Sequence, residues 1–251
     1  MNESVFDGKG TIYAQFRPTY PRTLLDYLRG NLGVNSRSII ADIGSGTGIL
    51  TQLLLDNFGK VLAVEPNHDM RMIAEARLNN ACGFTSINGT AENTTLLDHS
   101  VDFITVAQAF HWFNRLIFKR ECKRVLKSNG KVVLIWNCRD ENSSFVQETN
   151  MINGKYCPNF KGLAGGMRGA RNEDDFIDFF DGIYETNSFS NNLVFNEQGF
   201  IGLHQSASYA PMENDNSYMI YITELKELFD KYSNNGEVIM QNFTRCYAGK
   251  V

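Results

Sequence analysis

A glycine-rich turn flanked by two acidic residues is the part of the sequence whose residue types could do chemistry. The turn reads Asp42-Ile-Gly-Ser-Gly-Thr-Gly48 and follows the apolar run 38–43. Glycines at alternate positions let the backbone turn sharply after a strand and let a ligand approach it closely. The second carboxylate, Glu65, ends the next apolar run, where it can accept hydrogen bonds from both hydroxyls of a ribose. The pattern predicts a site for an adenosine-containing cofactor.

The spacing of the glycines separates two classes of cofactor. A dinucleotide fingerprint, G-x-G-x-x-G/A, requires glycine or alanine at residue 49, which is Ile49 here. A pyrophosphate also favours an uncompensated helix N-terminus, whereas Asp42 places negative charge beside the turn. That carboxylate would instead attract a cofactor with a sulfonium and an amino group. A nicotinamide cofactor remains one alternative. The other is that the glycine turn has a structural role only and binds no cofactor. An ATP-type P-loop is excluded because no Gly-Lys-Ser/Thr follows.

Candidate residues for the reacting end of the site come from two other segments. His111 and Trp112 follow the predicted strand 101–107, at the end where open α/β sheets place their ligands. His111 could act as a general base or a hydrogen-bond donor, or could simply close the pocket. If it is the base, His111→Ala lowers turnover more than acceptor affinity. Tyr13 and Arg17 could fold over the cofactor as an N-terminal lid, with Arg17 suited to a substrate carboxylate; the alternative is a segment held only by surface contacts.

The elements that must position these residues alternate between strand and helix. Helical patterns separate the first three predicted strands, and another precedes the fifth, which favours a parallel sheet covered by helices. Asn67 is a good helix N-cap, and Gly59 a good helix stop. The predicted strands are 38–43, 61–65, 84–87, 101–107 and 131–137, with a turn at 128–130 before the last.

The chain after residue 137 divides into a glycine-rich segment and a C-terminal part with predicted strands and helices. Residues 139–182 are glycine-rich and poorly periodic, which predicts an insertion that is either a mobile lid or a long surface connection. Residues 184–195 and 237–251 are expected to form two further strands, with helical segments at 198–204 and 221–232. We therefore expect one domain over 1–251, comprising an N-terminal lid or helix (1–37), a cofactor-binding core (38–137), the insertion (139–182) and C-terminal strands and helices (183–251).

Composition and charge indicate which classes of binding partner the protein is expected to lack. The 251 residues carry a formal net charge of −4, which argues against a general affinity for nucleic acid. The five cysteines are scattered and odd in number, as expected of free thiols in a reducing compartment, and neither they nor the four histidines have metal-ligand spacing. The sequence lacks a signal peptide and a membrane-length apolar run. We expect a cytoplasmic protein, monomeric or homodimeric, with no metal, membrane or nucleic-acid partner.

Five segments in chain order resemble class I S-adenosylmethionine-dependent methyltransferases of the type 11 subgroup. They are the glycine turn, Glu65-Pro66-Asn67, Thr90-Ala91-Glu92, Gln108-Ala-Phe110-His111-Trp112-Phe113, and Arg124-Val-Leu-Lys-Ser-Asn-Gly130 with the strand after it. The resemblance covers about residues 13–137. It implies a Rossmann-like, doubly wound, seven-stranded α/β sheet that is mostly parallel, with an antiparallel C-terminal strand and helices on both faces.

The resemblance also implies a role for each matching residue. The glycines would approach the amino-acid portion of S-adenosylmethionine with Gln108 nearby, Asp42 would orient that portion, and Glu65 would hold the ribose. The implied cofactor contacts are Asp42, Gly44, Ser45, Gly46, Gly48, Glu65, Pro66, Asn67, Ala91 and Glu92 (both at the adenine), and Gln108. The implied acceptor contacts are Tyr13, Arg17, Phe110, His111 and Trp112. For Glu92, an exposed loop charge is the alternative.

A looser resemblance concerns both ends of the chain. Tyr13-Ala-Gln-Phe-Arg17-Pro-Thr-Tyr20-Pro21 and Ser206-Ala-Ser-Tyr209-Ala-Pro211 are similar to a small-molecule subgroup that includes trans-aconitate methyltransferases. The implied function is in-line methyl transfer to a small-molecule acceptor, through a carboxylate, a hydroxyl or another O, N or C nucleophile. The alternatives are an NAD(P)-dependent oxidoreductase and a non-catalytic cofactor-binding homologue. A nucleic-acid methyltransferase is disfavoured because the chain lacks an Asn/Asp-Pro-Pro-Tyr/Phe motif.

Overall fold

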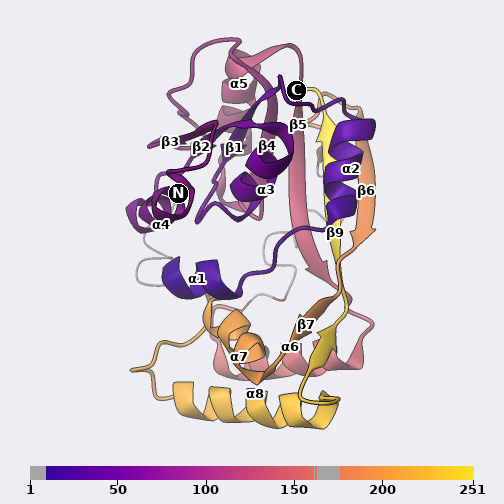
Figure 1. The fold of residues 1–251 in the computed structure, drawn as a ribbon. Coiled ribbons are helices and arrows are strands. Elements are labelled where there is room, and N and C mark those ends of the chain that lie inside the picture. Colours follow the sequence, from indigo (N-terminus) through magenta and orange to yellow (C-terminus); the bar gives the residue numbers. More distant parts are fainter. Residues whose placement is uncertain (1–9, 161, 163–175) are drawn as a thin grey trace.

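A seven-stranded sheet forms the centre of the molecule, whose computed structural model describes residues 10–160, 162 and 176–251. The strand order is β3-β2-β1-β4-β5-β9-β6 (Figure 1). β9 (Asn242–Gly249) runs antiparallel to both of its neighbours, β5 and β6 (Tyr184–Ser190). The parallel strands are β1 (Ile39–Ile43), β2 (Lys60–Val64), β3 (Phe84–Ile87), β4 (Val101–Ala107) and β5 (Leu126–Arg139). This topology confirms the expected Rossmann-like sheet, and the strand order reverses at β1.

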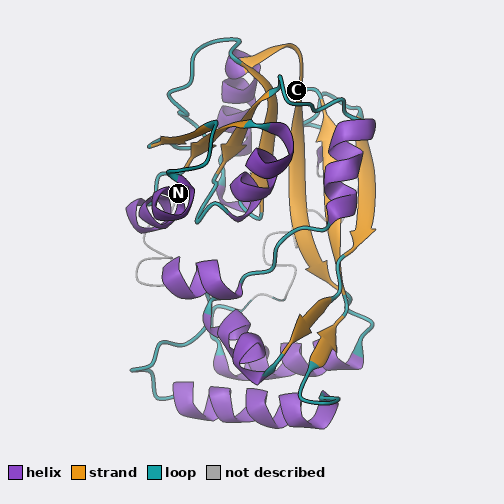
Figure 2. Cartoon of the chain, in the orientation of Figure 1, coloured by secondary structure: helices purple, strands orange, loops and turns teal. Residues whose placement is uncertain are grey.

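Helices cover both faces of this sheet, as expected (Figure 2). On one face, Leu28 of α2 (Arg22–Gly30) and Leu54 of α3 (Ile49–Phe58) are fully buried in the same apolar cluster. On the other face, Phe118 of α5 (Arg115–Val125) packs against an aromatic group at 176–180. Fully burying each such side chain stabilises the fold by about 1.5–3 kcal/mol. Within the described ranges, no helix is long and apolar enough to cross a membrane.

Local signals define the helix that follows β2. The Asn67 side chain accepts a hydrogen bond from the Met70 backbone N–H at 2.9 Å, which caps α4 (His68–Leu78). The helix before it, α3, ends at Gly59, whose φ of 103° suits glycine. Both signals were predicted from the sequence, and they lie on either side of β2 and of Glu65, which follows it.

A smaller layer of helices, here called the cap, lies beyond one end of the sheet (Figure 1). It comprises α6 (Ser144–Tyr156), α7 (Glu197–Gln205), α8 (Tyr218–Tyr232) and the two-stranded sheet of β7 (Leu193–Phe195) and β8 (Val238–Met240). The cap has its own apolar core, in which Phe200 and Leu225 are fully buried. The short helix α1 (Gly10–Phe16) lies between the cap and the sheet, where it contacts α7 and α4.

The expectation of an irregular segment over 139–182 is wrong for its first half. Residues 144–156 form α6, whose buried Phe145, Val146, Thr149 and Asn153 follow helical spacing. The polar members of that stripe and the glycine-rich sequence after it conceal the periodicity. The predicted glycine-rich loop itself, at 161 and 163–175, lies outside the described residues.

The predicted strand boundaries also need correction. Residues 184–195 and 237–251 each form two strands, because β6 and β9 belong to the main sheet while β7 and β8 pair in the cap. The chain crosses between the sheets at Asn191, whose side chain donates to the Thr19 carbonyl oxygen at 3.0 Å. β5 begins at Leu126 rather than residue 131, since its pairing with β4 is interrupted between Val101 and Phe103.

Candidate functional site

The glycine turn uses its three glycines for different reasons. Gly44, Gly46 and Gly48 all have positive φ, at 67°, 57° and 80°. A Cβ at Gly44 would lie 2.7 Å from the Ala109 side chain, and one at Gly48 would lie 2.8 Å from that of Leu78. A Cβ at Gly46 would meet nothing within 4 Å. Gly44 and Gly48 therefore serve packing, whereas Gly46 leaves its backbone open to a ligand.

Glu65 ties the end of β2 to this turn. Its carboxylate accepts hydrogen bonds from the Gly46 N–H at 2.8 Å and the Asn67 N–H at 2.9 Å. Burial raises the pKa of this carboxyl, although both backbone hydrogen bonds favour the charged form. The predicted ribose residue thus directly contacts the glycine turn, and it helps to hold the Gly46 peptide in place.

Asp42 places a buried negative charge at the end of β1. The side chain is 1% exposed and accepts hydrogen bonds from the hydroxyls of Thr51 at 2.6 Å and Thr105 at 2.9 Å. Burial raises the pKa of this carboxyl to about 6, with both hydroxyls opposing the shift. The group is therefore mostly ionised at pH 7, and each oxygen retains a lone pair for a cationic ligand.

A cavity of about 130 Å³ lies over the turn and Asp42. Its walls come from the N-terminal segment, the ends of the sheet strands and the cap. The predicted residues that line it are Tyr13, Arg17, Asp42, Gly44, Ser45, Gly46 and Gln108. Segments far apart in sequence thus meet at the point where the strand order reverses, which is where α/β sheets bind ligands.

Gln108 is held in an uncommon backbone conformation at this cavity. Its φ is 57°, a left-handed value that a residue with a side chain rarely adopts. The Gln108 N–H donates to the Ile135 carbonyl oxygen at 2.9 Å. The Gln108 side-chain amide donates to the backbone carbonyl oxygen of Asn137 at 3.3 Å. Pairing with β5 compensates the strain and keeps the side chain at the cavity wall.

Comparison with known proteins identifies the core that carries this cavity. Residues 41–134, from β1 to β5, match the family model described as a methyltransferase domain. Residues 41–134 are therefore similar to a methyltransferase domain. An uncharacterized methyltransferase of Mycobacterium tuberculosis is 38% identical over 143 residues, which cover 57% of this chain and 56% of that protein. An uncharacterized methyltransferase-like protein of Schizosaccharomyces pombe is 33% identical over 145 residues, which cover 57% of this chain and 56% of that protein.

A solved structure extends the likeness in fold beyond the methyltransferase domain's matched segment. A proposed type II methyltransferase from Anaeromyxobacter dehalogenans covers 94% of this chain and 98% of its own, with a TM-score of 0.60 and 20% sequence identity. The match to the curated relatives spans only about half of their length. The family uses S-adenosylmethionine as its cofactor, and the open backbone at Gly46 beside the ionised Asp42 fits that group's cationic amino-acid end. The narrower likeness to trans-aconitate methyltransferases stays a prediction.

Several predicted cofactor residues of the methyltransferase domain lie outside the cavity. They are Gly48, Glu65, Pro66, Asn67, Ala91 and Glu92. Ala91 is 1% exposed, and the Glu92 carboxylate accepts a hydrogen bond from the Asn114 N–H at 2.8 Å, at the start of α5. The cavity therefore covers only the part of the expected cofactor site near Asp42, and the ribose and adenine roles stay predictions.

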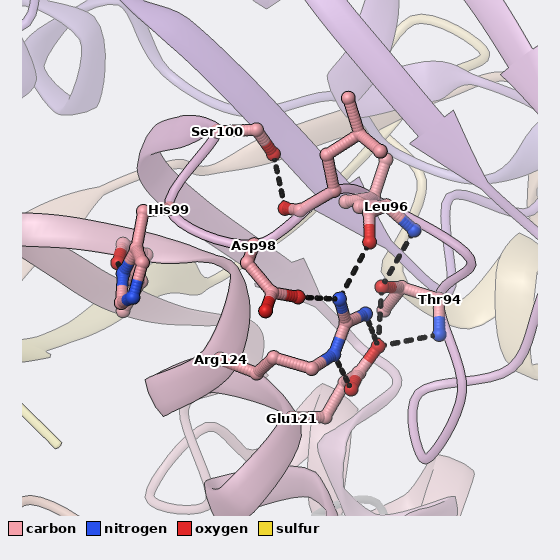
Figure 3. A network of polar contacts seen from close by, with 9 residues as sticks. Thr94, Leu96, Asp98, His99, Ser100, Glu121 and Arg124 are labelled. Carbon is pink, nitrogen blue, oxygen red and sulfur yellow. Dashed lines mark hydrogen bonds and ion pairs between the residues drawn. The ribbon is translucent and has the colours of Figure 1, made fainter.

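A polar network fixes the loop that follows Glu92 (Figure 3). The Glu121 carboxylate accepts from the Thr94 N–H at 2.8 Å and the Thr94 hydroxyl at 2.5 Å. Arg124 bridges Glu121 to the Leu96 carbonyl oxygen at 2.7 Å and to Asp98 at 2.6 Å. Two side chains of α5 thus hold the loop that directly follows the predicted adenine residues.

The predicted acceptor residues after β4 are placed differently from expectation. Phe110 is 1% exposed and packs edge-on against Trp136 and Phe179, so it belongs to the core and does not face the acceptor. The His111 and Trp112 rings contact one another, with centroids 4.8 Å apart, and neither lines the cavity. Burial lowers the pKa of His111 to about 4, which makes it neutral at pH 7, and its Nδ1 is buried without a hydrogen-bond partner.

The cavity also contains polar residues that the sequence reasoning missed. They are Tyr20, Thr47, Asn137, Arg139, Tyr209 and Asn242. Thr47 lies inside the recognised turn, and its buried hydroxyl has no hydrogen-bond partner. Arg139 ends β5 on the same sheet edge as Gln108, a position that could have marked it. Tyr209 lies in the more loosely similar segment 206–211, whereas Asn242 carries no comparable signal, because β9 brings it to the cavity from outside the similar segments.

Proposed function

We propose that this chain transfers a methyl group from S-adenosylmethionine to a small-molecule acceptor. The observation that carries the proposal is the pairing of an open Gly46 backbone with a buried, ionised Asp42 in one cavity of a methyltransferase domain. Because the curated relatives match over only about half of their length, the activity of the whole chain is a proposal.

The residues of this site contribute mainly position and electrostatics. S-adenosylmethionine supplies an already activated methyl group, so the protein has to align the acceptor and exclude water. We assign Asp42 to the cofactor's amino group and Gly44, Ser45 and Gly46 to close backbone contact with its amino-acid end. Tyr13 covers this end from α1, and Gln108 borders it just after β4.

The size of the cavity and the net charge of the chain support a small acceptor over a nucleic acid. The space of about 130 Å³ lies between the sheet edge, α1 and the cap, and the chain's net charge is −4. The oxidoreductase alternative is not favoured, because Ile49 replaces the small residue of a dinucleotide fingerprint. His111 stays the candidate base only for an acceptor that must lose a proton, and its position outside the cavity lining argues against that role.

Thermal unfolding with S-adenosylhomocysteine, and separately with NAD and NADP, tests the proposal. A ligand at about a hundred times its dissociation constant stabilises the folded state by roughly 2.7 kcal/mol, or several degrees for a chain of this size. We expect a shift with S-adenosylhomocysteine alone. A shift only with the nicotinamide cofactors would establish the alternative instead.

Two matched glycine variants locate the binding. Gly46→Ala and Gly33→Ala both force a side chain into a positive φ, 57° and 80°, and both new Cβ atoms meet open space. Each costs about 1–2 kcal/mol of stability from backbone strain. Only Gly46→Ala is expected to weaken S-adenosylhomocysteine binding, by tenfold or more in calorimetric titration. Equal affinity in the two variants would contradict the assigned site.

A further inference from the structure

Residues 17–20 form the N-terminal wall of the cavity, yet they have little backbone structure of their own. Pro18 and Tyr20 line the cavity, whereas the side chain of Thr19 between them is exposed and is not part of the lining. Within the described part of the chain, residues 18–20 make no backbone-to-backbone hydrogen bond. The buried Tyr20 ring anchors the wall in the apolar cluster that α2 and α3 share. A polar anchor for this wall must therefore come from side chains of other segments.

Two asparagine side chains supply that anchor at a single atom, the Thr19 carbonyl oxygen. The Asn137 side-chain amide donates to this oxygen at 3.2 Å, and the Asn191 side-chain amide donates to it at 3.0 Å. A carbonyl oxygen has two lone pairs, so both are used. The two donors lie 118 and 172 residues further along the chain, so the wall is held by groups that only the tertiary fold brings to it.

The groups around the Asn137 side chain determine which way its amide points. Its Oδ1 accepts hydrogen bonds from the Thr244 hydroxyl at 2.6 Å and from the Asn191 amide at 3.1 Å. An amide turned by half a rotation would place its own NH2 group against that of Asn191, donor against donor. Thr244 is fully buried in β9, where a hydroxyl needs a protein partner. The NH2 group of Asn137 is therefore directed to the Thr19 carbonyl oxygen.

Asn137 also holds a second wall of the cavity. Its backbone carbonyl oxygen accepts the hydrogen bond from the Gln108 side chain at 3.3 Å, and both residues line the cavity. Gln108 needs such support because its φ of 57° is left-handed. One residue of β5 thus fixes two walls, and Asn191 and Thr244 fix the orientation of that residue.

We propose that Asn191 and Thr244 are positioning residues of the cofactor site. Neither lines the cavity, and both act through Asn137; the three side chains are here called the amide clamp. The inference rests on the proposed function for the identity of the ligand. A wall that has to be ordered again at each binding event lowers affinity, so a loosened clamp weakens cofactor binding although no ligand contact is removed.

Matched threonine variants test the hydroxyl of the clamp. Thr244→Val keeps the shape of the side chain but removes the donor to Asn137, and Thr244→Ser keeps the donor. The control Thr149→Val removes another fully buried hydroxyl, which donates to the Phe145 carbonyl oxygen within α6 and does not line the cavity. In calorimetric titration, we expect Thr244→Val to weaken S-adenosylhomocysteine binding about fivefold, as one lost hydrogen bond can, and Thr244→Ser and Thr149→Val to stay within about twofold of wild type.

Asn191→Ala tests the other half of the clamp, and it carries the test if Thr244→Val does not fold. It removes the donors to both Thr19 and Asn137, so we expect a loss of affinity of about fivefold or more. In the ligand-free protein, amide hydrogen exchange over residues 10–20 should be faster in Asn191→Ala and Thr244→Val than in wild type, with exchange in α8 unchanged. A residue that only stabilised the fold would instead speed exchange in α8 as well, and would leave affinity unchanged well below the unfolding temperature.

The outcomes separate this inference from the proposed function. If wild type binds S-adenosylhomocysteine and Asn191→Ala and Thr244→Val bind it equally well, the inference fails and the proposed function stands. An equal loss of affinity in Thr149→Val would also overturn the inference, since the effect would then follow from lost stability in general. If wild type does not bind S-adenosylhomocysteine, the proposed function fails. Faster exchange over residues 10–20 in Asn191→Ala would then still support the clamp, and unchanged exchange there would overturn it.

Discussion

Asp42 and Glu65 are both buried carboxylates beside one turn, yet their partners give them different tasks. Glu65 accepts two backbone N–H groups and so stabilises the shape of the turn. Asp42 accepts only two hydroxyls, which can rotate, and it faces the cavity. Because hydroxyls compensate burial less well than a cation would, Asp42 is the residue whose charge should respond most to a cationic ligand.

The raised pKa of Asp42 makes cofactor binding depend on pH. With a pKa of about 6 in the folded protein, the carboxyl gains a proton as the pH falls below that value and loses its attraction for an amino group. We expect S-adenosylhomocysteine affinity, followed by calorimetry, to fall about tenfold from pH 7 to pH 5. Asp42→Asn should bind weakly with a flat profile over this range. The exposed Asp56→Asn is the control and should follow wild type; a parallel fall in Asp42→Asn would refute the assignment.

The raised pKa of Asp42 also determines how folding stability changes with pH. The folded protein holds this proton more tightly than the unfolded chain, for which the ordinary value is 3.8. The contribution of Asp42 to stability is therefore fully present below pH 3.8 and is lost as the pH rises through about 6. At pH 7 the ionised group is a cost to the fold, which a cationic ligand offsets.

The helices that surround the site differ in how clearly their sequences predict them. α3 and α4 follow apolar spacing and carry a clear stop and a clear cap residue, so the end of α3 and the start of α4 were predicted close to their true positions. α6 was missed because its buried stripe includes Thr149 and Asn153. Hydrophobic periodicity cannot detect a helix whose inward face is partly polar, and such a face forms only when a cap core supplies partners such as the Tyr221 hydroxyl.

The docking of α1 on α7 should control the N-terminal wall of the cavity. A Cβ at Gly202 of α7 would lie 2.4 Å from the Phe16 ring, at the end of α1. Gly202→Ala should therefore displace α1, which carries Tyr13, and weaken S-adenosylhomocysteine binding several-fold in titration. Gly154→Ala in α6 is the matched control, because its Cβ would meet nothing within 4 Å. It should stabilise the protein by about 0.5–1 kcal/mol in thermal unfolding without changing affinity. Equal affinities would show that α1 does not form the site wall.

At the level of the whole molecule, the site is a junction between two apolar cores. The sheet contributes the glycine turn and the ends of β1, β4 and β5, while the cap contributes Leu203 and Tyr209. Arg17 spans the junction, since it leaves α1 and donates to Ser206 just after α7. A ligand in the cavity touches both bodies and should couple them.

Hydrogen exchange can detect this coupling. We expect S-adenosylhomocysteine to slow amide exchange at residues 44–47 and also in α1, although the two lie far apart in sequence. α8 is the internal control, because none of its residues lines the cavity, and its exchange should stay unchanged. Protection limited to the glycine turn would show that the N-terminal segment is not a wall of the occupied site.

The order of strands and helices through β5, the glycine turn and its acidic partner could be derived from the sequence because each depends on local backbone chemistry. Positive φ requires glycine, and a buried parallel strand requires an apolar run. The place of Arg139 and Tyr209 in the cavity lining, however, is decided only in the folded molecule. The walls around them come from β5, α1 and the cap, segments that only tertiary packing brings together.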